Sequence, residues 1–152
     1  MAVTLKTISY QPYLEVKKLD GAYVLTNKMH LDCIIAIDEK DHNATFDFRP
    51  GFKCDGLSVP FGFRWYLPKW DENNPLYNIA GMVHDWLYAT KGQCIFSRSE
   101  CDDIFRGILR ESGISRCKAG MADWCVGVFA GGEKHWGNDD YGIKDLCKMS
   151  LK

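Results

Sequence analysis

The residues with the clearest chemical potential lie in one short run, Val83-His84-Asp85-Trp86-Leu87-Tyr88, where a histidine and a carboxylate stand side by side among apolar neighbours. Burying such a titratable pair is unfavourable unless each member is hydrogen-bonded, paired with a charge or bound to a metal. A histidine is suited to take a proton from water, and an aspartate to bind a cation. The run therefore indicates a functional site that other residues must complete.

A second carboxylate is expected to face His84 from a neighbouring helix around residues 101–109. At about 100° of rotation per residue, Asp102 lies on the border of the apolar face of that helix, whereas Asp103 points to solvent. Packing of the two helices would bring Asp102 to His84 as the residue that orients a general base, and would leave Asp85 to hold a metal. The alternative is a structural His84–Asp102 hydrogen bond that ties the helices together, with Asp85 facing solvent.

The segment 51–60 is rich in residues that turn the chain and expose backbone groups. As a ligand loop, it would supply oxygen ligands from Asp55, Ser58 and backbone carbonyls. As a tight turn, it would use the side chains of Asp55 and Ser58 as caps. Both interpretations stay open.

Two other hydrolase chemistries could use the same histidine. Ser58 could be a nucleophile with His84 as base and Asp102 as orienter, because such a triad is defined by geometry and not by order along the chain. Ser58 does not, however, stand in a Gly-x-Ser-x-Gly elbow. A metal phosphohydrolase would need further histidine ligands, which would have to come from His30 or His42.

The sequence predicts an α+β fold, with a small antiparallel sheet formed by an N-terminal meander and about three packed helices after it. Turn residues separate β-prone runs at 23–26, 31–37 and 45–48. Apolar residues then recur at helical spacing from about residue 77 and again at 101–109, with Gly113 placed to end the second helix. A third helix is expected from Ser115, as its N-cap, to about Ala130. We expect a single domain over 1–152, with 139–152 as a loosely held tail.

Composition narrows the class of protein. The formal net charge is -1, with acids and bases mixed along the chain, so nucleic acid is not an expected partner. No apolar run approaches the roughly 18 residues that suggest a membrane span, and the N-terminus does not resemble a signal peptide. The seven cysteines are scattered and form no CxxC pair, which favours reduced thiols over disulfides or a structural zinc site.

Taken together, the motifs resemble a family of small phage and prophage proteins of unknown function. They are Pro-Gly-Phe-x-x-Asp-Gly-x-Ser-x-Pro at 50–60, His-Asp-x-Leu-Tyr at 84–88 and Arg-x-x-x-Asp-x-x-Phe at 98–105, followed by Gly132 and Trp136. The resemblance implies a phage origin and a location in the host cytoplasm or the virion. A phage protein could also be a virion component or an inhibitor of a host protein, and the aromatic segment 61–70 would suit such a protein interface. That segment could instead be a loop that covers the core.

The helical pair is also distantly similar to secreted phospholipase A2, in which His-Asp-x-x-Tyr on one helix faces an aspartate on another. The resemblance implies His84 as the base, Asp85 as the calcium ligand and Asp102 as the orienter, with Asp55-Gly56 in the calcium-binding loop. The glycine-rich loop of that superfamily is not reproduced, and its cysteine scaffold is not evident. On this basis we expect a metal-dependent hydrolase of an ester or lipid substrate, with calcium as the favoured divalent metal.

Overall fold

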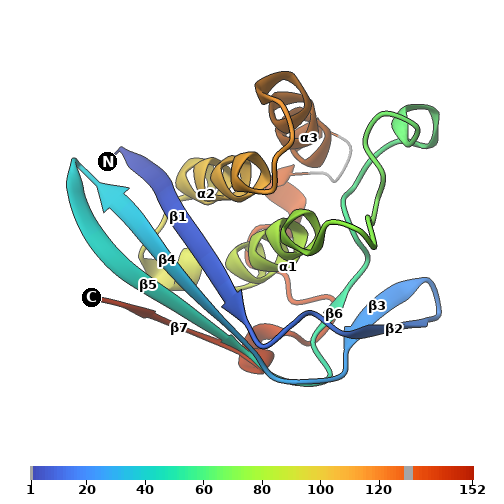
Figure 1. The fold of residues 1–152 in the computed structure, drawn as a ribbon, viewed down its shortest axis with the longest axis horizontal. Helices are drawn as coiled ribbons and strands as arrows, with labels where there is room; N and C mark the ends of the chain where they lie inside the picture. The colour runs from blue at the N-terminus through green and yellow to red at the C-terminus, as the bar shows by residue number, and fades with distance from the viewer. Residues whose placement is uncertain (1, 129–131) are drawn as a thin grey trace.

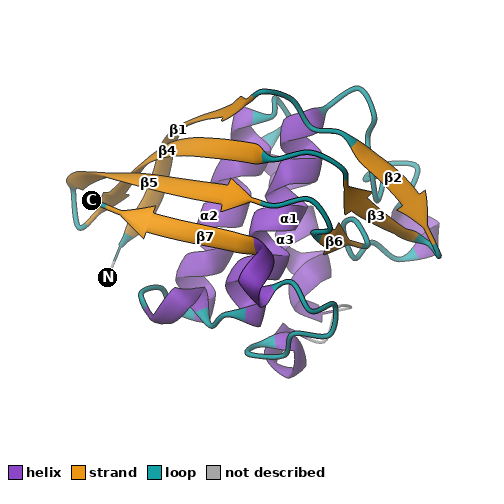
Figure 2. Ribbon diagram, turned by 90° about the horizontal axis from the view of Figure 1, so that it is seen from below, coloured by secondary structure: helices purple, strands orange, loops and turns teal. Residues whose placement is uncertain are grey.

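The computed structural model describes residues 2–128 and 132–152, which form an α+β fold of two antiparallel sheets and three α-helices. The larger sheet has the strand order β1-β4-β5-β7, and the smaller has the order β2-β3-β6. The strands are β1 (Val3–Gln11), β2 (Val16–Leu19), β3 (Ala22–Leu25), β4 (Met29–Ile37), β5 (Lys40–Phe48), β6 (Lys53–Cys54) and β7 (Cys147–Leu151). The helices lie on one side of the larger sheet, with α2 against β1 and α3 against α2 (Figures 1 and 2). The predicted fold class is confirmed.

The helices are α1 (Pro75–Ala89), α2 (Arg98–Glu111) and α3 (Arg116–Val128), and the single-turn helices are η1 (Phe61–Phe63), η2 (Gly92–Cys94), η3 (Gly132–His135) and η4 (Lys144–Leu146). Each α-helix begins at a side-chain cap. The side chain of Asn74 accepts from the Tyr77 amide, and Ser97 forms a capping box with Glu100. Ser115 Oγ accepts from the Lys118 amide at 3.2 Å, as expected of an N-cap. The expected end of the third helix, Ala130, lies outside the described residues.

Helix α1 is the central element, because nearly all of its side chains are buried. Its Trp86 ring packs edge-on against Phe46 of β5, with 6.0 Å between ring centroids. The indole Nε1 of Trp86 donates to the Lys144 carbonyl at 3.1 Å, so the polar end of this buried ring is satisfied. Burial on both sides fixes the position of α1, and with it the position of His84 and Asp85. None of the described helices is long and apolar enough to cross a membrane.

The C-terminal residues are more ordered than the sequence suggests. Residues 139–152 were expected to form a loosely held tail, but Cys147–Leu151 forms β7 and pairs with β5 in the register Phe48↔Cys147 to Ala44↔Leu151. The backbones of Asn43 and Lys152 exchange two further hydrogen bonds of 2.9 Å. The physical reason is a short alternation: Cys147 is buried and Met149 and Leu151 pack against the core, whereas Lys148 and Ser150 point outward.

Candidate functional site

The expected contact between α1 and α2 forms. His84 Nε2 lies 3.0 Å from Asp102 Oδ1, and the Tyr88 hydroxyl donates to the same oxygen at 2.8 Å. The nearly buried His84 ring packs between Tyr88 and Phe105, with centroid distances of 4.2 and 4.7 Å. Because an ionised carboxylate can only accept, Nε2 carries the proton in the neutral ring and Nδ1 keeps a lone pair.

Tyr88, one turn after His84, also contacts Asp102, a contact that the sequence analysis did not assign. Its hydroxyl satisfies Asp102 together with the histidine, and burial followed by the Asp102 carboxylate raises the pKa of Tyr88 above its ordinary range. The signal was present in the four-residue spacing, which places both side chains on one helical face.

The solvent exposure of Asp103 differs from that of Asp102 less than the helical phase predicts. Its side chain is 33% exposed, against 24% for Asp102, and it pairs with Arg106. Arg106 Nε also lies 3.5 Å from Asp123 Oδ2 on α3. Burial, followed by the charge of Asp102, raises the pKa of Asp123 to about 6, and Arg106 opposes this rise. A group of three carboxylates around one guanidinium thus lies near His84.

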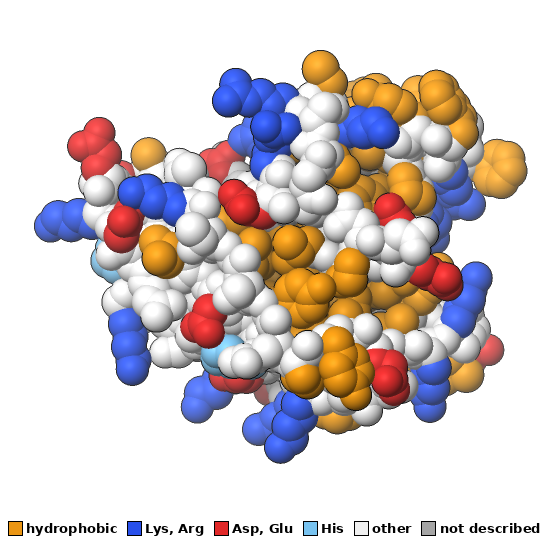
Figure 3. Space-filling model, viewed as in Figure 1, with side chains coloured by type: hydrophobic (Ala, Val, Ile, Leu, Met, Phe, Trp, Pro, Cys, Tyr) orange, Lys and Arg blue, Asp and Glu red, His pale blue; other side chains and the backbone are white. Residues whose placement is uncertain are grey.

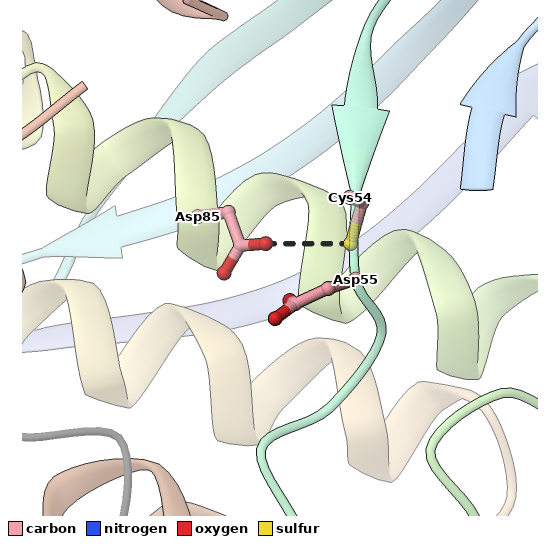
Figure 4. A group of neighbouring side chains, drawn as sticks. All are labelled: Cys54, Asp55 and Asp85. Atoms are coloured by element: carbon pink, nitrogen blue, oxygen red, sulfur yellow. Dashed lines mark hydrogen bonds between the residues drawn. The ribbon is translucent and has the colours of Figure 1, made fainter. Parts of the chain in front are cut away.

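Asp85 lies in a second group, with Cys54 at the end of β6 and Asp55 directly after it (Figure 4). One ligand atom from each of the three side chains lies within 4.8 Å of the others. The Cys54 thiol donates to Asp85 Oδ2 at 3.3 Å, and its sulfur accepts from the Gly56 amide at 3.4 Å. These three residues form a candidate metal-binding group with two carboxylates and one thiol.

Burial dominates the electrostatics of this group. Burial, with the neighbouring Asp55 carboxylate, raises the pKa of Asp85 to about 7, and this net value includes the opposite effects of His84 and the Cys54 thiol. Burial also raises the pKa of the Cys54 thiol well above its ordinary range, with the Asp85 charge adding to the effect. A bound cation would relieve the repulsion between the two carboxylates.

The loop after β6 has a shape that only glycine allows at residue 56. Gly56 has a φ of +83°, and a Cβ there would lie 2.5 Å from the Lys69 carbonyl oxygen. The same carbonyl accepts from the Leu57 amide at 2.9 Å, so the two ends of the segment 57–69 are held together. This closure places Asp55 and Ser58 beside α1.

A pocket of about 230 Å³ is lined both by His84 and by two members of the candidate metal-binding group, Asp55 and Asp85. Four of the residues singled out from the sequence line it, namely Asp55, Ser58, His84 and Asp85. Asp102 lies behind His84 and is not part of the lining. His30 and His42, the ligands that a phosphohydrolase site would need, lie on β4 and β5 and are absent from the residues that line the pocket.

One wall of the pocket comes from the segment 132–146, which the sequence analysis did not connect with the site. The lining residues of this segment include His135, Asp140 and Tyr141, and His135 Nδ1 lies 3.6 Å from Asp140 Oδ2. Burial, followed by the Asp55 carboxylate, raises the pKa of Tyr141 above its ordinary range. The Gly137 amide donates to the Tyr88 carbonyl at 2.7 Å and fastens the segment to α1.

The comparisons with known proteins give one result. A family model described as "Protein of unknown function (DUF1353)" matches residues 31–126. The chain belongs to the DUF1353 family. Neither the curated proteins nor the solved structures contain a match. The DUF1353 region runs from β4 to near the end of α3, so it contains Cys54, Asp55, His84, Asp85 and Asp102, whereas the wall formed by 132–146 lies outside it.

Proposed function

We propose that this DUF1353 protein is a hydrolase in which His84 activates a water molecule for attack on an ester or lipid carbonyl. The observation that carries the proposal is the His84–Asp102 hydrogen bond at the wall of the pocket that also contains Asp55 and Asp85. Because Nε2 is engaged by Asp102, Nδ1 is the ring nitrogen that remains to accept a proton.

The proposed reaction needs few groups. Nδ1 of His84 takes a proton from water while the water oxygen forms a bond to the carbonyl carbon. Asp102 stabilises the resulting imidazolium, and the same proton then passes to the leaving oxygen as the ester bond breaks. Tyr88 keeps Asp102 in position through its own hydrogen bond. The products are a carboxylic acid and an alcohol.

A divalent cation bound by Asp85 and Asp55 would polarise the carbonyl and stabilise the negative charge that develops on its oxygen. Calcium is the favoured ion because carboxylates and loop carbonyls are hard oxygen ligands. The Cys54 sulfur lies close enough to act as a third ligand and would favour zinc instead. Comparing cations in the wild type and in Cys54→Ser distinguishes the two, since only zinc binding should weaken strongly.

The second candidate is a non-enzymatic binding protein, either a phage virion component or an inhibitor of a host protein, in the host cytoplasm or the virion. It is favoured by the exposed aromatic side chains of Phe61 and Trp65, which are 84% and 83% exposed. Tryptophan is common among the residues that dominate protein interfaces. In this case the His84–Asp102 bond would be structural.

The test is hydrolysis of a panel of esters and phospholipids, with calcium, magnesium, manganese or zinc and with chelator. His84→Gln should remain folded and lose at least about a hundredfold in rate. His42→Gln, on the sheet, is the matched control and should keep full activity. Ser58→Ala should also remain active, and its inactivation would instead support Ser58 as a nucleophile. A folded, metal-supplied wild type that hydrolyses nothing in the panel would favour the binding protein.

A further inference from the structure

Large apolar side chains are exposed on two segments beside the pocket. We call them the aromatic rim: Phe61, Phe63 and Trp65 on the loop after β6, and Trp124 and Val128 on α3. Their exposed fractions are 84%, 41%, 83%, 53% and 54%. Hydrophobic side chains gather over the η1 loop at the upper right of Figure 3 and continue down the middle of the same face.

The rim adjoins the pocket on both sides. Leu57 and Ser58, which line the pocket, lie directly before the aromatic loop, and Val126 lines it from α3. The loop is also anchored: Leu67 is fully buried, and Arg64 Nε donates to the Val59 carbonyl at 3.2 Å. The exposed rings are therefore presented by a fastened loop at the edge of the site.

Scattered exposed apolar residues are normal, but a group on two adjoining segments marks an interaction surface. Folding alone gains nothing from exposing Phe61 and Trp65, because their burial would be favourable. The rings of Phe61 and Trp65 can thus bury their exposed surface against a partner that approaches this side of the pocket.

The charges around the rim indicate the chemistry of that partner. Residues 56–70, which lie between Asp55 and Asp71, contain Arg64 and Lys69 and no acidic residue. The Arg64 guanidinium lies 5.5 Å from the centre of the Phe61 ring, and Lys118 Nζ lies 4.8 Å from that of Tyr66. A second copy would offer the cations of this loop the same cations and not a row of anionic groups, so it is less complementary than an anionic surface. Aromatic rings interspersed with cations fit the interface of an anionic membrane, where rings enter the headgroup region and cations bind the phosphates.

We propose that the aromatic rim binds the surface of membranes that contain anionic phospholipids, with Phe61 and Trp65 entering the headgroup region. The pocket, which Ser58 and Val126 line beside the rim, then lies close to the bound membrane. That the bound lipid is also the substrate rests on the proposed hydrolase function, whereas the membrane binding itself does not.

The experiment is flotation with vesicles of phosphatidylglycerol and phosphatidylcholine in equal parts, and with vesicles of phosphatidylcholine alone. The wild type is compared with Phe61→Ser/Trp65→Ser and with Tyr13→Ser/Leu19→Ser, a control pair that is 53% and 48% exposed elsewhere on the surface. The rim variant should bind at least about tenfold more weakly, because it loses two large apolar side chains. The control pair should bind like the wild type, and salt should reduce the preference for the anionic vesicles.

Binding is measured in chelator and on the His84→Gln protein as well, so it does not depend on turnover or on a metal. A wild type that binds the vesicles but hydrolyses nothing would count against the hydrolase and not against the membrane surface. The membrane proposal is overturned if the wild type does not float with the anionic vesicles, if it shows no preference for them, or if both double variants lose binding equally. Light scattering that shows a dimer abolished by Phe61→Ser/Trp65→Ser would overturn it in favour of a second copy.

Discussion

Replacing Asp102 should reveal how strongly its carboxylate holds α1 and α2 together. Its Oδ1 accepts from His84 Nε2 at 3.0 Å and from the Tyr88 hydroxyl at 2.8 Å, and both donor side chains are largely buried. Asp102→Ala leaves both donors without their acceptor, and each unsatisfied group costs about 1–3 kcal/mol. We therefore expect Asp102→Ala to lower the free energy of unfolding by about 2–6 kcal/mol. Asp102→Asn keeps an acceptor oxygen but loses the charge, so its cost should be smaller, about 1–2 kcal/mol.

The assay is urea unfolding of the wild type, both Asp102 variants and Asp103→Ala. Asp103 is the matched control because it lies next in the chain and pairs with the half-exposed Arg106, an interaction worth about 1 kcal/mol or less. The reasoning is refuted if Asp102→Ala costs no more than Asp103→Ala. An Asp102→Asn cost equal to that of Asp102→Ala would show that the charge, and not the acceptor geometry, stabilises the pair.

Three further predictions concern the surroundings of the pocket. A bound divalent cation should raise the thermal midpoint of the wild type and not that of Asp85→Asn, since an ion present at about 100 times its Kd adds about 2.7 kcal/mol; equal midpoints with cation and chelator would contradict this. The pKa of Asp123 in the folded protein, about 6, lies above its ordinary value of 3.8. The protonated Asp123 side chain therefore stabilises the fold fully below pH 3.8, and this stabilisation is lost as the pH rises through about 6. The free energy of unfolding of Asp123→Asn, measured by urea titration and compared with that of the wild type, should hence increase by at most about 3 kcal/mol between about pH 4 and 6. A difference between the two proteins that does not change with pH would contradict this. Gly56→Ala should lower the thermal midpoint more than Gly113→Ala, because both have positive φ but only the first added methyl meets a carbonyl, at 2.5 Å; equal losses would show that this contact is easily relieved.

Local periodicity was enough to predict the contact between His84 on α1 and Asp102 on α2. The helical phase of α2 places Asp102 against His84 as expected, but Asp103 is only slightly more exposed than Asp102 and pairs with Arg106. The turn residues around Asp55 correctly mark a loop that reaches the same pocket as Asp85. These are short-range patterns, in which the identity and spacing of neighbouring residues determine which face a side chain occupies.

The sequence did not predict the features that depend on contacts between distant parts of the chain. The strand β1 has a shift in register between Leu5 and Thr7, which interrupts the alternation that would have revealed it. Cys54 becomes a candidate ligand only because β6 brings its sulfur to Asp85 on α1. Nothing in the spacing of Tyr141 shows that it lies beside Asp55. The part of the site that the sequence did not predict is therefore the pocket wall formed by 132–146, which is distant in the chain from Asp55, His84 and Asp85.

The pairing of β5 with β7 has a consequence for how the pocket is assembled. All three α-helices lie between these strands in the chain, so their pairing closes a long loop, and contacts of this kind are entropically costly and slow to form. Before β7 pairs, the segment 132–146 lacks its anchor on the C-terminal side. The DUF1353 region can pack its sheet and helices first, while the pocket stays open where His135 and Tyr141 will stand. We therefore expect the pocket wall formed by 132–146 to be completed late in folding, when the edge strand docks.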